Sequence, residues 1–173
     1  MNKKDFSRKC LADALITLLE ENKYEDITIQ DIVDKAGFSR MAYYRNFKDK
    51  NEIIDYYLDN FFNNFINEAD LSYNRMGAEL FFETLFKFFS EKQMVRLCNL
   101  FLERGLIGAI ANQFIKRTQG GFIPNQSHYF YDFLAGGFFA VYLAWINDGL
   151  KESPEEMAKQ AMNYVIMLKK KSL

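Results

Sequence analysis

The chain has 173 residues and a formal net charge of −1 at pH 7. At roughly 100–200 residues per domain, this length allows one large domain or two small ones. Hydrophobic residues make up 49% of the chain and aromatic residues 17%. Intrinsic disorder is excluded, because disordered chains lack the apolar surface that offsets the entropy of ordering. The nearly neutral total charge by itself gives no indication of a nucleic-acid partner.

Cysteine content and hydropathy exclude further classes of protein. Cys10 and Cys98 lie in separate apolar stretches and are expected to be reduced, buried thiols. The sequence has no Cys-x-x-Cys pair or Cys/His cluster, so the ligands of a structural zinc site are missing. The longest nearly uncharged apolar run, 133–146, has 14 residues, against about 20 for a membrane span. The charged N-terminus does not resemble a secretory signal. We expect a cytoplasmic chain that binds no metal, cofactor or membrane.

Apolar residues recur at helical spacing along almost the whole chain, and no segment shows the sustained alternation of a half-buried strand. The sequence therefore predicts an all-α fold of about nine helices. The expected helices lie near residues 6–19, 28–35, 39–45, 49–66, 77–90, 93–103, 106–117, 126–149 and 154–170.

Local signals support several helix boundaries. Thr28, with Asp31 three residues later, predicts a capping box at the start of one helix. Ser153 followed by Pro154 predicts a second helix start, with a hydroxyl cap and proline at the first helical position. Gly149 is placed to end the long apolar helix.

Two short predicted helices, 28–35 and 39–45, are joined by the turn Ala36-Gly37-Phe38. Short helices connected by a three- or four-residue turn containing glycine are typical of a helix-turn-helix. Gly37 supplies the positive φ of the turn, and Ser39 can cap the second helix. Such a second helix can enter the DNA major groove with its N-terminal residues against base edges.

The run from Ile27 to Ile54 resembles the DNA-binding domain of the TetR family of bacterial transcription regulators. It combines a hydroxyl-capped helix, an Ala-Gly-x-Ser turn, an aromatic-Tyr-x-x-Phe segment and a lysine opening the next helix. The resemblance covers about residues 5–60. It implies a helix-turn-helix DNA-binding domain over residues 1–49 and a helical effector-binding and dimerisation domain over residues 50–173. Double-stranded DNA and a second copy of the chain are then the expected partners.

Candidate DNA contacts follow from the resemblance and from side-chain chemistry. Arg40 has the fork geometry that pairs with guanine, and Met41 is suited to a thymine methyl group. Tyr44 matches the family's phosphate-contacting tyrosine, whereas Tyr43 is expected in the core. The base-contacting candidates are Gln30, Arg40 and Met41, and the phosphate-contacting candidates are Thr28, Ser39, Tyr44, Arg45, Lys48 and Lys50. Arg45 and Lys48 have a second interpretation as solvated surface charges.

Small residues recur every four positions on the long apolar helix, a spacing that permits close approach of a partner helix. With the last helix, this stripe predicts a dimer interface of Gly136, Ala140, Ala144, Met157, Ala161 and Val165. The stretch from Tyr131 to Ala158 also resembles, loosely, the C-terminal domains of regulators related to those of dihydroxyacetone kinase operons.

The second half is rich in aromatic residues, which have two interpretations. The first is a packed core that includes Phe81, Phe82, Phe86, Phe88, Phe89, Phe101, Phe114, Tyr129, Phe130, Phe138 and Phe139. The second is an aromatic pocket for a small apolar or cationic effector, lined by Phe86, Phe101, Phe114, His128 and Phe138. No catalytic constellation is present, because nothing near His128 supplies a nucleophile or metal ligands.

The resemblance thus implies a dimeric transcription regulator and not an enzyme, namely a repressor that a small-molecule effector releases from a pseudo-palindromic operator. The alternative is a DNA-bound scaffold that recruits a protein partner and takes no small molecule. The charge distribution supports DNA binding. Residues 35–50 carry a net charge of +4 and residues 3–9 a net charge of +3, whereas residues 20–34 carry −5. Phosphate binding depends on local potential, which the total charge conceals.

Overall fold

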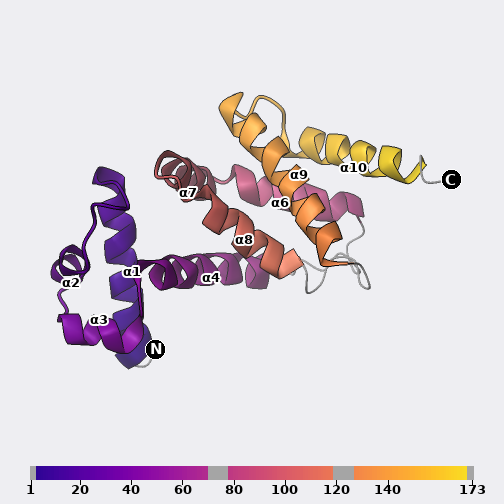
Figure 1. Cartoon of the computed structure of the whole chain (residues 1–173). Coiled ribbons are helices and arrows are strands. Elements are labelled where there is room, and N and C mark those ends of the chain that lie inside the picture. The colour runs from indigo at the N-terminus through magenta and orange to yellow at the C-terminus, as the bar shows by residue number, and fades with distance from the viewer. Residues whose placement is uncertain (1–2, 70–77, 119–126, 171–173) are drawn as a thin grey trace. The chain divides into compact units, whose positions relative to one another are not determined.

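The structure is a computed structural model that describes residues 3–69, 78–118 and 127–170 (Figure 1). All regular elements in these ranges are α-helices, so the predicted all-α fold is confirmed. The helices are α1 (Lys3–Glu21), α2 (Ile29–Ala36), α3 (Arg40–Asn46), α4 (Lys50–Ala69), α6 (Ala78–Ser90), α7 (Lys92–Glu103), α8 (Ile107–Thr118), α9 (His128–Asn147) and α10 (Pro154–Lys170).

The chain forms two compact units. The first comprises residues 1–64 together with 100–110, and the second comprises residues 65–99 and 111–173. The boundary on the N-terminal side therefore falls inside α4, and the turn between α7 and α8 belongs to the first unit. The predicted division at residue 49 separates a DNA-binding domain from an effector-binding domain. The two compact units are defined by packing instead, so the functional division stays a prediction.

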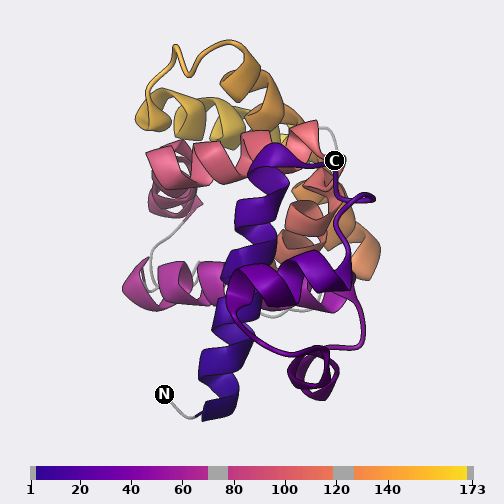
Figure 2. The same cartoon turned by 90° about the vertical axis from the view of Figure 1, so that its left-hand side faces the viewer.

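The core of the first unit forms along one face of α1, on which α2 and α3 pack (Figure 2). Leu11, Leu15 and Leu19 recur every four residues and have no exposed surface. Ser7 begins the same inward row and is also buried. Phe6, the first residue of the helix expected at residues 6–19, is 52% exposed. A four-residue row that starts at position 7 leaves position 6 beside it.

The core of the second unit is built from aromatic rings of α6, α8 and α9. The ring of Phe89 lies within 5.0 Å of that of Phe138 and 4.6 Å of that of Tyr142, measured between centroids. The Tyr142 hydroxyl donates to the Phe89 carbonyl at 2.9 Å. Burial raises the pKa of the Cys98 thiol to about 11, so this cysteine is a protonated core residue. Tyr129, predicted in the core, is 73% exposed at the start of α9.

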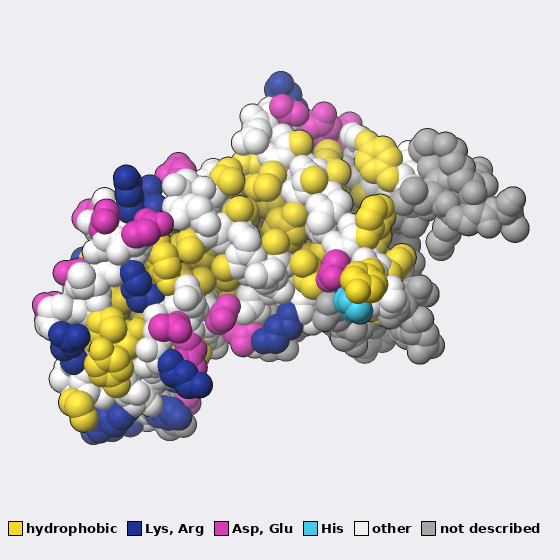
Figure 3. Space-filling model, viewed as in Figure 1, with side chains coloured by type: hydrophobic (Ala, Val, Ile, Leu, Met, Phe, Trp, Pro, Cys, Tyr) yellow, Lys and Arg dark blue, Asp and Glu magenta, His cyan; other side chains and the backbone are white. Residues whose placement is uncertain are grey.

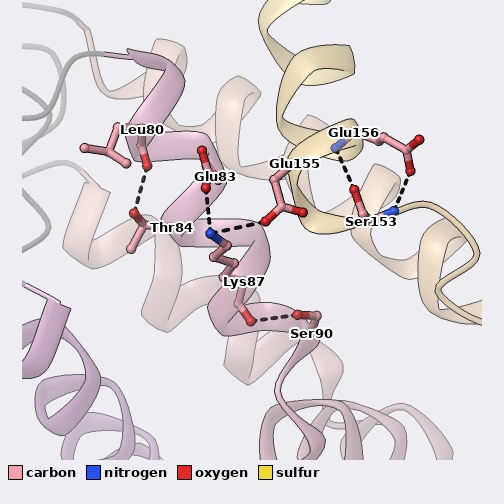
Figure 4. Close-up of polar contacts among 8 residues, drawn as sticks. All are labelled: Leu80, Glu83, Thr84, Lys87, Ser90, Ser153, Glu155 and Glu156. Atoms are coloured by element: carbon pink, nitrogen blue, oxygen red, sulfur yellow. Dashed lines mark hydrogen bonds and ion pairs between the residues drawn. The ribbon is translucent and has the colours of Figure 1, made fainter.

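Helices α6 and α10 pack together in this unit, and polar contacts mark their junction (Figure 4). The Lys87 ammonium lies 2.6 Å from the Glu83 carboxylate on its own helix and 3.2 Å from that of Glu155 on α10. Hydrogen bonds to these carboxylates raise the pKa of Lys87. At the start of α10, Ser153 and Glu156 exchange hydrogen bonds in a capping box, which confirms the predicted helix start.

Helix α9 is apolar on two sides. Its inner side buries Tyr131, Ala135, Phe139, Tyr142 and Trp145. Its outer side exposes further apolar residues, which include Tyr129 and Phe133. By length and composition, α9 is the one helix in the described ranges that would suit a membrane span. A single such helix is weak evidence, because a core helix meets the same criterion.

Candidate nucleic-acid interface

The turn between α2 and α3 has the local geometry of a helix-turn-helix. The Thr28 hydroxyl accepts from the Asp31 backbone N–H at 3.2 Å, and the Asp31 carboxylate accepts from the Thr28 N–H at 2.8 Å. The Thr28 hydroxyl also donates to the Asp31 carboxylate at 2.6 Å, and this bond, together with the one from the Thr28 N–H, lowers the pKa of Asp31. Gly37 has φ of 72°, in the left-handed region that ends α2 at low cost. The Ser39 hydroxyl accepts from the Ala42 N–H at 3.2 Å and caps α3.

The two helices differ in direction, since Figure 1 views α2 along its axis and shows α3 in the plane of the page. Helix α3 is held from beneath by two aromatic residues, Tyr43 and Phe47, which are 0% and 2% exposed. The outer face carries Arg40, Met41 and Tyr44, of which Met41 is 69% and Tyr44 53% exposed. The prediction that Tyr43 is buried and Tyr44 exposed is confirmed. The N-terminal end of α3 therefore presents a cation, a thioether and a phenol to the outside.

Several candidate DNA contacts already have partners within the chain. The Gln30 amide donates to the Asp34 carboxylate at 2.8 Å, and the Arg45 Nε donates to the Met41 carbonyl at 3.2 Å. Both side chains are exposed, and these one-turn contacts hold them close to the helix surface. An approaching base or phosphate would compete with the intrahelical acceptor.

Lys50 differs from the other candidates because its ammonium points inward. Its Nζ donates to the carbonyls of Tyr24 and Ile27, each at 2.6 Å, and lies 4.4 Å from the Tyr24 ring centroid. The Tyr24 hydroxyl in turn donates to Asn51 at 2.8 Å. Lys50 therefore fastens the loop between α1 and α2 to the start of α4. Only its third ammonium hydrogen is left for a phosphate.

Carboxylates occupy the start of α4. The Asp49 side chain accepts from the Glu52 N–H at 3.0 Å, and the Glu52 carboxylate accepts from the Lys48 N–H at 2.6 Å. The Asp49 carboxylate thus satisfies one of the N–H groups that a bare helix N-terminus would offer to an anion, and Glu52 places a second negative charge there. The exposed Lys48 ammonium is thus the more direct phosphate candidate at this corner.

Arg8 is a residue of this unit whose packing the sequence did not indicate. Its guanidinium carbon lies 5.0 Å from the Phe47 ring centroid and 4.3 Å from that of Tyr56. The cation thus joins α1 to the residue that ends α3 and to α4. Arginine on the polar side of an amphipathic helix usually stays in solvent, so pattern alone gave no signal for this contact.

The basic residues of the two positive segments gather on this unit. Figure 3 shows Lys and Arg side chains along the lower edge of the view, around α3 and the start of α1. Arg40, Arg45 and Lys48, from the second of these segments, are all exposed. In the described ranges, no group of three or more His, Cys, Asp or Glu side chains is arranged to hold a metal ion.

The predicted dimer residues have different environments. Gly136, Ala140 and Ala144 lie on the exposed side of α9. A Cβ atom built on Gly136 meets no other atom within 4 Å. On α10, Met157 is only 6% exposed and Ala161 is half-buried. Met157 therefore has little surface left for a partner, because it packs within its own unit. The side chain of Val165 lies outside the described residues.

The predicted pocket residues are largely packed. Phe86 and Phe101 have no exposed surface, and Phe114 is 8% exposed. The Phe138 ring lies 5.3 Å from that of Phe86 and 5.0 Å from that of Phe114. These distances favour the core interpretation for the phenylalanines. His128 is exposed, with its ring 3.8 Å from that of Tyr129.

Comparison with known proteins gives matches in both halves. Residues 11–57 match the family described as bacterial regulatory proteins, tetR family, and residues 78–166 match the family described as transcriptional regulator C-terminal region. A curated relative, the HTH-type dhaKLM operon transcriptional activator DhaS of Lactococcus lactis, is 29% identical over 68 residues. This match covers 39% of the present chain and 36% of that relative.

Two solved structures are similar over nearly the whole chain. A TetR transcriptional regulator from Streptococcus agalactiae has a TM-score of 0.65 at 17% identity, and the dihydroxyacetone kinase operon activator DhaS has 0.52 at 19%. Each comparison covers 94% of this chain and 95% of the other. At these identities the structures show the fold. Together with the two family matches and the exposed recognition helix, they show that the chain belongs to the TetR family of bacterial regulatory proteins.

Proposed function

We propose that the chain is a dimeric, sequence-specific DNA-binding transcription regulator that reads base edges with α3. This proposal rests on how α3 is oriented in the first unit. Its inner side buries Tyr43, with Phe47 at its end, and its outer side exposes Arg40, Met41 and Tyr44. An exposed helix N-terminus carrying arginine is the arrangement that enters a major groove.

The roles assigned to individual residues are part of this proposal. Arg40 and Met41 contact bases, and Gln30 does so once it leaves Asp34. The phosphate contacts are Tyr44, Arg45 and Lys48, with Thr28 and Ser39 beside them, and Lys50 adds its remaining N–H. Phosphate contacts fix the register of the protein on DNA, and base contacts supply the specificity.

The exposed apolar side of α9 supports dimerisation. Tyr129 and Phe133 are 73% and 64% exposed and lie on the same side as Gly136, Ala140 and Ala144. Large apolar patches of this kind mark interaction sites. On α10, Tyr164 is 50% exposed and replaces the buried Met157 as a candidate for the partner face. A dimer with two-fold symmetry would present two recognition helices to a pseudo-palindromic site.

Two modes of regulation remain as proposals. The first is release from the operator by a small apolar or cationic effector, which requires the aromatic residues of the second unit to open. The second is recruitment of a protein partner without a small molecule. The close packing of Phe86, Phe114 and Phe138 favours the second. The name of the curated relative describes a transcriptional activator, so both repression and activation are compatible with the fold.

Selection of DNA duplexes from a random library tests the proposal without knowledge of the operator. The full chain should enrich an inverted repeat whose half-sites are centred about one helical turn, roughly 34 Å, apart. The Arg40→Ala variant should enrich a motif that is degenerate at one position of each half-site. Recovery of no motif by the folded wild-type chain would contradict sequence-specific binding.

A further inference from the structure

The turn between α7 and α8 is built into the DNA-binding unit. Residues 100–110 cluster with residues 1–64, and Phe101 and Ile110, near the two ends of this segment, have no exposed surface. Gly105, with φ of 69°, ends α7, and the Leu106 N–H donates to the Phe101 carbonyl at 2.7 Å. These contacts fix the position of Arg104 in the turn.

Arg104 binds the end of α1 through two arms of its guanidinium. Its Nε donates to the Leu19 carbonyl at 2.7 Å, and its Nη2 donates to the Glu20 carbonyl at 2.9 Å. The Nη1 lies 3.9 Å from the neighbouring Glu103 carboxylate, and the Arg104 side chain is 20% exposed. The rigid guanidinium fork matches two successive carbonyls, whereas a lysine ammonium is a point charge without this geometry.

Helix α1 lacks a cap of its own at these positions. The last carbonyls of a helix have no partner within the helix. The Leu18 carbonyl accepts from the backbone and side chain of Asn22, at 3.0 and 2.9 Å, and Arg104 takes the next two. The last turn of α1 carries no basic residue. A cation at this end therefore offsets both the helix dipole and the two glutamates that close the helix.

We propose that Arg104 is a positioning residue for the helix-turn-helix, through which the second half of the chain controls DNA binding. Helix α1 packs on both α2 and α3, so the position of its end bears on how α3 is presented. Helices α7 and α8 both continue from the turn into the second unit. A change there that shifts either helix withdraws the guanidinium from α1. This inference rests on the proposed DNA binding.

The coupling must act in both directions. If the Arg104 contact favours the DNA-binding arrangement of α1, then DNA binding must stabilise the contact by the same free energy. The segment 100–110 should therefore be more ordered in the DNA complex than in the free chain. A cap that only stabilises the fold would show no such response, because its contacts would be equally formed in both states.

Hydrogen exchange of the full chain tests the proposal, with and without a duplex recovered by the selection above. In the wild type, DNA should slow amide exchange at residues 100–110 as well as at α3. In Arg104→Gln, protection at α3 should persist, protection at 100–110 should be lost, and the affinity for the duplex should fall about three- to tenfold. Arg104→Lys should not restore the response, and Lys92→Gln, an exposed change at the start of α7, should behave as wild type.

Unchanged exchange at residues 100–110 when the wild type binds the duplex would overturn the role of Arg104 and leave the proposed function standing. This comparison of the free and DNA-bound wild type needs no variant, so it is decisive even if Arg104→Gln fails to fold. Failure of the wild type to bind any selected duplex would instead overturn the proposed function on which the inference rests.

Discussion

Two adjacent tyrosines on the recognition helix have opposite environments. The rings of Tyr43 and Tyr44 meet edge to face, 5.3 Å apart between centroids. The Tyr43 ring is fully buried, and its hydroxyl finds no hydrogen-bond partner within the described part of the chain. The Tyr44 side chain is 53% exposed. We therefore assign a structural role to Tyr43 and the proposed phosphate contact to its neighbour Tyr44.

Removing each hydroxyl separates these roles. Tyr43→Phe should leave the free energy of unfolding unchanged or raise it by about 1 kcal/mol, because it removes a buried polar group without a partner. Tyr44→Phe should leave stability unchanged and weaken binding to all duplexes by about 1 kcal/mol, because a phosphate contact is lost. Chemical denaturation and duplex titration measure the two effects. The reverse assignment of effects would show that Tyr44 supports the fold.

The pKa values of Tyr24 and Tyr43 predict how stability depends on pH. Burial, reinforced by the Asp49 carboxylate, raises the pKa of Tyr24 and of Tyr43 from 10.0 to about 12. The folded chain therefore holds these protons more tightly than the unfolded chain. Their contribution to stability is complete below pH 10 and is lost as the pH rises from about 10 to 12. Denaturation curves of Tyr43→Phe should show a smaller loss in this interval, and parallel losses would contradict the assignment.

At the scale of the element, the start of α4 combines a structural and a candidate DNA-binding lysine. Lys50→Met should lower the free energy of unfolding by about 2–3 kcal/mol, because two charge-assisted bonds to the loop carbonyls of Tyr24 and Ile27 are lost. Lys48→Met, at an exposed position, should leave stability unchanged and reduce the salt dependence of DNA binding by about one unit of slope. If both variants only reduce the slope, the inward contacts of Lys50 contribute nothing to the fold.

Helix α9 gives a second test at this scale. Gly136→Ala should leave the folded protomer intact or slightly stabilised, since an added Cβ meets nothing within 4 Å and alanine favours helix. It should nevertheless weaken dimerisation, because the glycine is proposed to allow close approach of a partner helix. Analytical ultracentrifugation measures the dimer, with Gly108→Ala, at another exposed helical glycine, as the control. Equal dimer affinity in both variants would remove Gly136 from the interface.

For the whole molecule, contacts between residues close in sequence could be predicted from the sequence, whereas contacts between residues far apart in sequence could not. The caps at Thr28, Gly37 and Ser153 follow from chemistry within a few residues, and the structure confirms them. The exposure of Tyr129 could not be predicted, because α9 is apolar on both sides and its pattern does not show which side is inward. The Arg104 contact, which spans 85 residues, left no local signal.

The total charge of the molecule likewise differs from the charge of its individual segments. The total of −1 is the sum of basic segments on the candidate DNA-binding surface and acidic segments elsewhere. Binding should therefore weaken strongly with salt despite the low total charge, since each phosphate contact releases counterions. The slope of log affinity against log salt concentration should be determined by the exposed basic residues of α3 and the start of α4, and not by the net charge.

The most direct test of the account is the specificity ratio of Arg40→Ala, measured by fluorescence anisotropy at fixed salt with the selected duplex and a scrambled duplex. The wild type should prefer the selected duplex by about 10³-fold or more. Arg40→Ala should lose about 1–3 kcal/mol of discrimination at one base pair of each half-site. Lys92→Ala, which removes an equal charge from the second unit, should match the wild type. Equal ratios for all three proteins would contradict base reading by α3.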